Sequence, residues 1–404
     1  MFHCYDTHID VRWRENRQRS MIKMKLPSSQ FTKDQEKFRL EVRSFLQKEL
    51  ANRTFETACD SWLSGCNPQF SKKIAEQGWI GLTWPQKYGG QERSAIDRYI
   101  LTEEFLAIGA PVAAHWIADR QTGPLLLRYG TEEQRSYFLP RITNAECFFA
   151  IGLSEPNSGS DLASVSTNAK KVEGGWLVNG AKTWTSNAHD AHFMITLVRT
   201  APYDKDSKHS GLSQMIIDLH DKGVSVKPIK YLTGERHFNE VFFEDVFVPD
   251  NRIVGTIGEG WKQGLAELAF ERSGPERILS TFPLLEEIYS ILKQQQNKEA
   301  MNRLTELVAK LWSLRNLSLG VAKMLEQGGE VAVPAALVKA MGTQFEQSIP
   351  EMVRLLTETY PTMDAQKMLD RYMAQSILHS PGFTIRGGTT EILYGIIAKD
   401  VING

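Results

Sequence analysis

The sequence has no hydrophobic run long enough to cross a bilayer and almost no net charge. A membrane-spanning helix needs an apolar stretch of about 18 residues or more, and none occurs among the 404 residues. A formal net charge of −1 gives no general attraction to nucleic acid or to an anionic membrane. What remains is a globular composition, 42% hydrophobic and 24% charged, and the length indicates two or three domains.

Cysteine is also scarce, and its spacing does not suggest a metal or redox site. The chain has four cysteines, at positions Cys4, Cys59, Cys66 and Cys147, and none of them belongs to a C-x-x-C pair or to a zinc-like pattern. We therefore predict no metal site. The same scarcity favours a reducing, intracellular setting, either the cytoplasm or, in a eukaryote, the mitochondrial matrix.

The first 23 residues differ from the rest of the chain. Arginines and acidic residues are mixed there, and the segment lacks the apolar core of a secretory signal. The acidic residues also argue against an organellar transit peptide. Met21 and Met24 are alternative starts. We predict that residues 1–23 form a disordered extension without a catalytic role.

Hydrophobic periodicity divides the rest of the chain into three segments. In residues 24–146 apolar residues recur mostly every three or four positions, as between Phe38 and Leu50, which is typical of helices. In residues 147–255 the period falls to about two, and Gly174-Gly175 separates two strand-like runs as a hairpin turn would. Helical patterning returns in residues 256–404. Helices, then strands, then helices predict an α+β fold rather than βαβ alternation.

The same patterns give approximate bounds for individual elements. Before the β segment we expect helices at residues Arg98–Ile108 and Glu132–Leu139, and within it strands at His192–Val198, Gln214–Ile217 and Glu240–Phe243. After it we expect helices at Leu265–Ile278, Phe282–Gln295, Glu299–Gly328, Ala335–Thr357, Ala365–Ile377 and Glu391–Ile402.

The most informative string is GLSEPNSGSD, from Gly152 to Asp161, which follows the apolar run Phe148–Ile151. Small residues in such a turn let backbone N–H groups and short hydroxyls approach an anionic or heteroaromatic ligand closely. A plain surface turn would explain the Gly and Ser residues, but not the whole string. The string closely resembles the flavin-binding signature of the acyl-CoA dehydrogenase family.

Three further strings extend this resemblance from about Phe31 to Ile402. Lys182–Asn187 resembles the second flavin segment, Phe243–Pro249 the exit from the β domain, and Gly388–Ile392 the C-terminal turn that touches the flavin. The resemblance implies a helical N-terminal domain, a middle β-barrel-like domain and a C-terminal domain of the four-helix-bundle type. It also implies FAD, held by Ile151, Leu153, Ser154, Ser160, Trp184, Ser186, Thr389 and Glu391.

Two of these cofactor residues also have a purely structural interpretation. Trp184 could be a buried tryptophan on a strand, without contact to any ligand. Thr389 is suited to capping a helix N-terminus, with Glu391 in the first turn. For Thr389 the structural role and the ligand role do not exclude each other.

The family reaction requires a base that removes the α-proton of an acyl-CoA thioester while a hydride leaves the β-carbon for flavin N5. Because that proton is weakly acidic, the base must be desolvated and the carbonyl polarised by hydrogen bonds. Many members carry the base in Tyr-Glu-Gly-Thr, but here Gly387 occupies the position of that Glu. A minority of family members place the base directly before an Arg on a helix, and Glu271-Arg272 matches that pattern.

We therefore predict that Glu271 is the base and that the Gly387 N–H helps to hold the thioester oxygen. The alternative is that Glu271 only pairs with an arginine on a helix surface. The resemblance further implies that Arg272 and Ser160 bind the acyl-CoA substrate, and that an electron-transfer flavoprotein accepts the electrons. The expected activity belongs to the breakdown of fatty acids or other lipids.

The C-terminal segment lacks two motifs that typical family members use to reach a neighbouring subunit's FAD. Neither Arg-x-x-Phe-Gly nor Gln-x-x-Gly-Gly-x-Gly is present. The buried pyrophosphate charges then need donors or cations from elsewhere, either other residues of a homo-oligomer, such as Arg303 or Arg315, or a related second chain. A flavin-dependent monooxygenase of the same fold and a non-catalytic partner subunit remain alternative functions.

Overall fold

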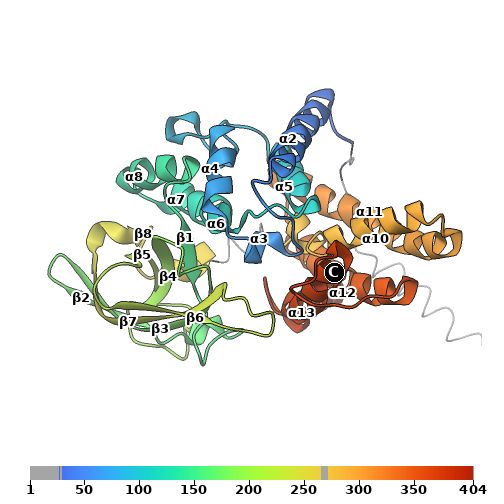
Figure 1. Cartoon of the computed structure of the whole chain (residues 1–404). Helices are drawn as coiled ribbons and strands as arrows, with labels where there is room; N and C mark the ends of the chain where they lie inside the picture. The colour runs from blue at the N-terminus through green and yellow to red at the C-terminus, as the bar shows by residue number, and fades with distance from the viewer. Residues whose placement is uncertain (1–26, 28–29, 265–271, 404) are drawn as a thin grey trace, which may run out of the picture.

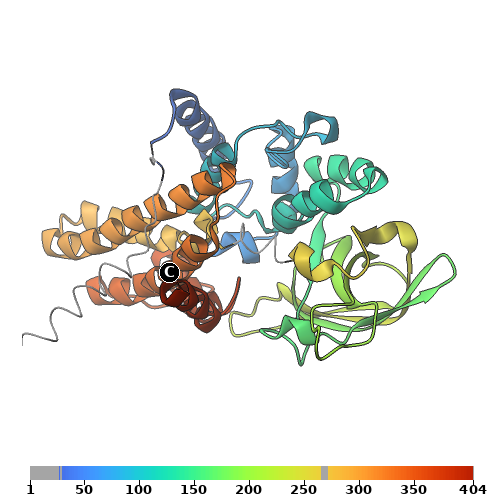
Figure 2. The ribbon, with the colours of Figure 1, turned by 180° about the vertical axis from the view of Figure 1, so that it is seen from behind.

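The computed structural model describes residue 27, residues 30–264 and residues 272–403. Helices form the N-terminal part, a single sheet forms the middle, and helices form the C-terminal part (Figure 1). This arrangement confirms the predicted α+β fold. In both views the short helix α3 (Ser61–Ser64) lies between the sheet and the C-terminal helices (Figures 1 and 2).

The N-terminal part begins with helix α2 (Lys33–Ala51). Its start is fixed by a capping box, in which Thr32 accepts a hydrogen bond from the Gln35 N–H and Gln35 bonds back to the Thr32 backbone. The other elements here are α4 (Pro68–Glu76), η1 (Gln86–Tyr88), α5 (Ala95–Ala107), α6 (Ala113–Ile117), η2 (Ala118–Thr122), α7 (Gly123–Tyr129) and α8 (Glu132–Thr143). The helices predicted near α5 and α8 are confirmed.

The middle part is an eight-stranded sheet. Its strands are β1 (Phe149–Gly152), β2 (Asn168–Val172), β3 (Gly175–Ser186), β4 (Phe193–Arg199), β5 (Leu212–Asp218), β6 (Val224–Ile229), β7 (Phe238–Pro249) and β8 (Ile253–Val254). They follow the order β6-β7-β3-β2-β4-β5-β8, with β1 parallel to β4. The hairpin predicted at Gly174-Gly175 is confirmed, because β2 and β3 pair antiparallel across that turn.

The C-terminal part consists of α10 (Phe282–Gln294), α11 (Lys298–Glu326), α12 (Ala332–Leu356), α13 (Met368–Phe383) and α14 (Thr390–Asn403). The helix predicted up to Ile278 is wrong in its described part. After residue 271 the chain turns through Ser273 and Gly274 into a short 3-10 element, η5 (Pro275–Arg277). Proline lacks an N–H and clashes with the preceding helical turn, so Pro275 ends the helical pattern.

Two large hydrophobic clusters stabilise these parts. One contains buried residues of both helical parts, from Phe38 on α2 to Met373 on α13, so the two parts share one core. The sheet has a second cluster, which includes Met194 on β4 and Val241 on β7. Among the described helices, none is both long and apolar enough to cross a membrane.

Candidate active site

The signature loop after β1 is anchored by a buried ion pair. The Glu155 carboxylate accepts hydrogen bonds from Lys182 Nζ at 2.7 Å, from the Ser166 N–H at 2.7 Å and from the Thr167 N–H at 2.9 Å. Lys182 also donates to the Leu153 carbonyl oxygen at 3.1 Å. The Glu of the signature therefore fixes the loop against β3 and does not point to solvent.

Burial and charge pairing have opposite effects on the pKa values of Glu155 and Lys182. Burial alone would raise the pKa of Glu155, but the charge and hydrogen bond of Lys182, together with the Thr167 and Ser166 donors, hold that pKa at about 2. Desolvation is the larger effect on Lys182 and lowers its pKa to about 8, although Glu155 acts to raise it. Both groups are charged at neutral pH, so the loop is held by a full ion pair.

The predicted cofactor residues of the loop and of β1 lie around this anchor. Ile151 on β1 and Leu153 just after it are half-buried. Ser154 is also half-buried, and its carbonyl oxygen accepts a hydrogen bond from the Thr183 N–H at 2.9 Å. Ser160 is exposed further along the loop. The loop thus turns back onto β3 at Thr183, one residue before Trp184.

Trp184 projects from the sheet at an irregularity of β3. Its φ of +56° is uncommon for a bulky residue, and the β3–β7 register shifts between Lys182 and Thr185. The side chain is 58% exposed and contacts Phe238 edge-on at a centroid distance of 5.9 Å. The interpretation as a buried strand tryptophan is therefore wrong. Strained conformations of this kind concentrate at functional sites.

A second group of predicted residues lies on the turn between α13 and α14. Gly387 and Gly388 both have left-handed backbones, with φ of +68° and +101°. Thr389 Oγ1 accepts a hydrogen bond from the Ile392 N–H at 3.4 Å, as a helix cap does. Glu391 is exposed in the first turn of α14. Within the described chain the Gly387 N–H has no hydrogen-bond acceptor.

Two arginines converge on Gly387. Arg272 Nε donates to the Gly387 carbonyl oxygen at 3.1 Å. Arg277 is only 1% exposed, and its guanidinium lies over the Trp62 ring. A Cβ atom at position 387 would come within 2.8 Å of Arg277 Nη2. Arg277 therefore fills the space in which a side chain at position 387 would begin. The predicted base, Glu271, lies outside the described residues.

Next to this turn, charged groups from all three parts of the chain meet in a buried network. Arg386 donates to Asp60 Oδ1 at 2.5 Å and to Ser280 Oγ at 2.7 Å. His379 Nε2 lies 2.7 Å from Glu235, and its Nδ1 lies 3.4 Å from Asp60. Sequence patterns gave no indication of this network, because Asp60 and Arg386 are 326 residues apart.

Buried charge in this network changes several pKa values. Desolvation would raise the pKa of Asp60, but Arg386 and His379 outweigh it and hold that pKa at about 2. Desolvation dominates at the buried Glu346, whose pKa rises to about 7 even though Arg386 acts to lower it. No cluster of metal-binding side chains occurs among the described residues.

Comparison with known proteins identifies the family. The model of the acyl-CoA dehydrogenase N-terminal domain matches residues 32–146, and that of the middle domain matches residues 150–246. Acyl-CoA dehydrogenase IpdE1 of Mycobacterium tuberculosis is 31% identical over 387 residues, which cover 91% of this chain and 97% of that protein.

Comparison with solved structures points to the same family. A steroid acyl-CoA dehydrogenase titled Tcur3481-Tcur3483 superposes with a TM-score of 0.83 at 26% identity and covers 94% of this chain and 99% of its own. A chain of the ChsE4-ChsE5 complex from Mycobacterium tuberculosis gives a TM-score of 0.80 at 27% identity, with 94% and 99% covered. The fold and these matches define a member of the acyl-CoA dehydrogenase family. This chain is accordingly an acyl-CoA dehydrogenase, an oxidoreductase of acyl-CoA thioesters.

Proposed function

We propose that this chain catalyses the α,β-dehydrogenation of an acyl-CoA thioester with FAD as cofactor and Glu271 as the α-proton base. The observation that carries the assignment of the base is the position of Arg277 beside Gly387. A cation and a left-handed glycine occupy the place where most family members carry the Glu. The base must therefore come from another residue, and the Glu-Arg pair at 271–272 is the family's other pattern.

The contact between Arg272 and Gly387 supports this choice. Because Arg272 Nε bonds to the Gly387 carbonyl oxygen, the chain position directly after Glu271 is tied to the turn that holds the predicted thioester donor. Three apolar residues precede Glu271 in the sequence, Leu268-Ala269-Phe270, which suits a carboxylate that must be desolvated to act as a base. The Gly387 N–H would polarise the thioester carbonyl and thereby acidify the α-proton.

The residues present fit FAD. Trp184 offers a large, exposed aromatic face beside the half-buried Ser186, and the anchored signature loop brings Ser154 next to β3. Ile151, Leu153 and Ser160 would complete this side of the cofactor, and Thr389 and Glu391 would contact it from the α13–α14 turn. When bound, FAD would accept the hydride from the β-carbon at N5. Arg272 and Ser160 would bind the CoA ester, and an electron-transfer flavoprotein would then take the electrons.

We also propose that a related second chain completes the FAD site. The two cross-subunit motifs are absent, and Arg315, one candidate replacement, binds Glu103 within the same chain at 2.5 and 2.8 Å. Arg303 pairs with Glu299 on the same helix. Large apolar side chains are exposed on the C-terminal helices and turns, among them Trp312, Ile385 and Tyr394, and such groups often mark protein interfaces. The similar structures titled as two-component proteins support this arrangement.

Deuterium exchange tests the base directly. The enzyme is incubated with an acyl-CoA in D2O without an electron acceptor, and deuterium uptake at the α-carbon is followed by mass spectrometry. Glu271→Gln keeps the side-chain volume but removes the basic oxygen, so exchange should slow by about 10²- to 10⁴-fold. Glu259→Gln, which only breaks a surface pair with Lys262, should exchange at the wild-type rate. Equal exchange in both variants would refute the assignment.

A further inference from the structure

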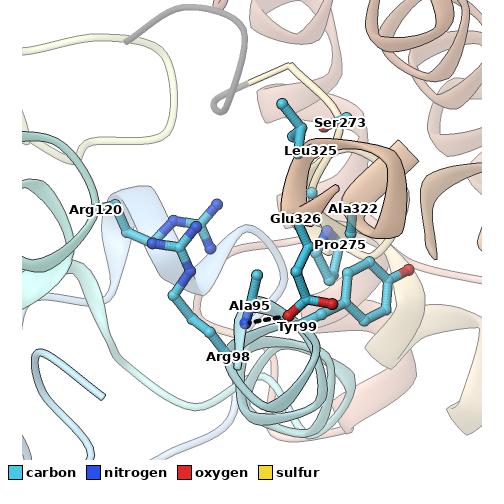
Figure 3. A pocket seen from close by; sticks show the side chains of 10 residues that line it. Ala95, Arg98, Tyr99, Arg120, Ser273, Pro275, Ala322, Leu325 and Glu326 are labelled. Atoms are coloured by element: carbon cyan, nitrogen blue, oxygen red, sulfur yellow. Dashed lines mark hydrogen bonds between the residues drawn. The ribbon is translucent and has the colours of Figure 1, made fainter. Parts of the chain in front are cut away.

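A small cavity lies between α5, η2, the turn after Arg272 and α11 (Figure 3). Its volume is about 100 Å³, which is room for several water molecules or for a carboxylate and a few adjoining carbons. Figure 3 shows the side chains of Arg98 and Arg120 on one side and those of Pro275 and Glu326 on the other. The wall thus combines apolar side chains such as Ala322 and Leu325 with the two arginines, whereas a pocket for a plain fatty acyl tail would have no such cations.

The two arginines differ in how they are held. Arg120 donates to Glu276 at 2.8 Å and to Thr102 at 3.2 Å, and it lies over the Trp116 ring. Arg98 makes no ion pair with any residue in the described part of the chain. Arg120 is thus a fixed part of the wall, while the Arg98 guanidinium remains available to a ligand.

The environment of Arg98 is unfavourable for a lone cation. Burial is the main effect and lowers its pKa to about 10, and the nearby charge of Arg120 lowers it further. The group is still protonated at neutral pH. Arg98 is only half-buried by solvent exposure, and a partly desolvated cation beside a like charge still costs free energy unless an anion pairs with it.

Each carboxylate around the cavity already accepts a hydrogen bond from another group, although Glu276 Oε2 has no partner among the described residues. Asp119 accepts a backbone N–H at 2.7 Å, Glu276 accepts from Arg120, and Glu326 accepts the backbone N–H at the start of α5 at 3.1 Å. Asp119 and Glu276 act on Arg98 only as charges, without a hydrogen bond. The hydrogen-bonding capacity of the Arg98 guanidinium is consequently left for a group that enters the cavity.

The cavity is also in the right place for the end of a substrate. Ser273 and Gly274 line it and follow Arg272 directly in the chain. Arg272 in turn bonds to the Gly387 carbonyl oxygen, so the cavity is connected through Arg272 to the turn where the thioester is proposed to bind. Because guanidinium groups match carboxylates in shape and charge, we propose that the cavity binds a carboxylate at the far end of the acyl chain. The substrate class is then an ω-carboxylated acyl-CoA, an inference that rests on the proposed function.

The test compares matched acyl-CoA pairs of four to eight carbons, one member ending in methyl and the other in carboxylate. Affinity is measured by titration calorimetry and kcat/KM by flavin reduction, on the protein with any partner that co-purifies. We expect the carboxylated member of the best pair to bind about ten- to a hundredfold more tightly, the range typical of a charged hydrogen bond. Arg98→Met should abolish this preference, and Arg98→Lys should retain part of it. Arg128→Met, an exposed control, should leave the preference unchanged.

Two outcomes would overturn the proposal. Equal or weaker binding of the carboxylated member in the wild type would refute it, as would an unchanged preference in Arg98→Met. Failure of every acyl-CoA to reduce the flavin, with the preference in affinity intact, would instead count against the proposed function. Unchanged binding of the methyl-terminated member by Arg98→Met shows that its loss of preference is not a folding defect.

Discussion

Gly387 is the residue at which this chain departs most clearly from the common pattern of its family. It combines a left-handed backbone with a close approach to the buried Arg277. A side chain there carries two penalties. The left-handed conformation alone costs a non-glycine residue roughly 1–2 kcal/mol, and the first added carbon would press on Arg277 Nη2. We expect Gly387→Ala to lower the thermal midpoint by several degrees and to slow flavin reduction.

Gly382, five residues earlier on α13, provides the matched control. Its backbone is not left-handed, and a Cβ there would meet nothing within 4 Å. Alanine is the better helix former, so Gly382→Ala should keep or raise the midpoint. If Gly387→Ala unfolded at the wild-type temperature, position 387 would tolerate a side chain and Arg277 would not exclude one there.

Some site residues could be predicted from the sequence and others could not. The resemblance to the family supplied Trp184, and the cap preference of Thr explained Thr389, because both depend on local strings. The contact of Arg277 with Gly387 joins residues 110 positions apart, and the ion pair of Glu155 with Lys182 joins residues 27 positions apart. Periodicity carries no information about such contacts. The sequence therefore indicated that the usual base is absent at position 387, but it did not indicate that Arg277 lies there.

Among the elements, α13 connects the three parts of the molecule through His379. Burial alone would lower the pKa of His379, but its contacts with Asp60 and Glu235 raise it to about 9. The charged imidazolium is thus favoured in the folded state. Its stabilising effect is complete below the ordinary pKa of 6.5 and is lost as pH rises through about 9.

This shift gives a pH prediction. Denaturant unfolding of the wild type and of His379→Gln is compared at several values between about pH 6 and pH 10. The wild type should be more stable at the acidic end, and its advantage should shrink through the window from 6.5 to 9 by on the order of 2–3 kcal/mol, since each pKa unit is worth about 1.4 kcal/mol. A difference that stays constant across the range would show that His379 is not charged in the folded state.

Element prediction succeeded where periodicity was sustained. The helices α10, α11, α12 and α14 and the β2–β3 hairpin lie close to their predicted bounds, because each has a regular apolar pattern and a clear turn. The prediction for α13 was less accurate, since the helix runs from Met368 to Phe383 and not from Ala365 to Ile377. The short helices α3, α6 and α7 and the strands β6 and β8 were missed. Elements of two to seven residues offer too few positions for a period to emerge, and tertiary contacts decide their conformation.

At the scale of the whole molecule, the missing cross-subunit motifs predict a heteromer. Expressed alone, the chain should contain less than one FAD per chain, because the pyrophosphate charges lack their usual donors. Co-expression with a related chain that carries both motifs should raise occupancy toward the full level. FAD content and mass in solution are measured together. A homo-oligomer of this chain with full FAD occupancy would contradict the prediction.

Glu271 is proposed to start the oxidation of the acyl-CoA, and single-turnover flavin reduction measures that step. The FAD-loaded protein, with its partner if one is needed, is mixed anaerobically with an acyl-CoA in a stopped-flow instrument, and loss of the oxidised flavin absorbance is recorded. The wild type should bleach, whereas Glu271→Gln with equal FAD content should bleach at least about 100-fold more slowly. Near-wild-type bleaching in Glu271→Gln would show that Glu271 is not the base.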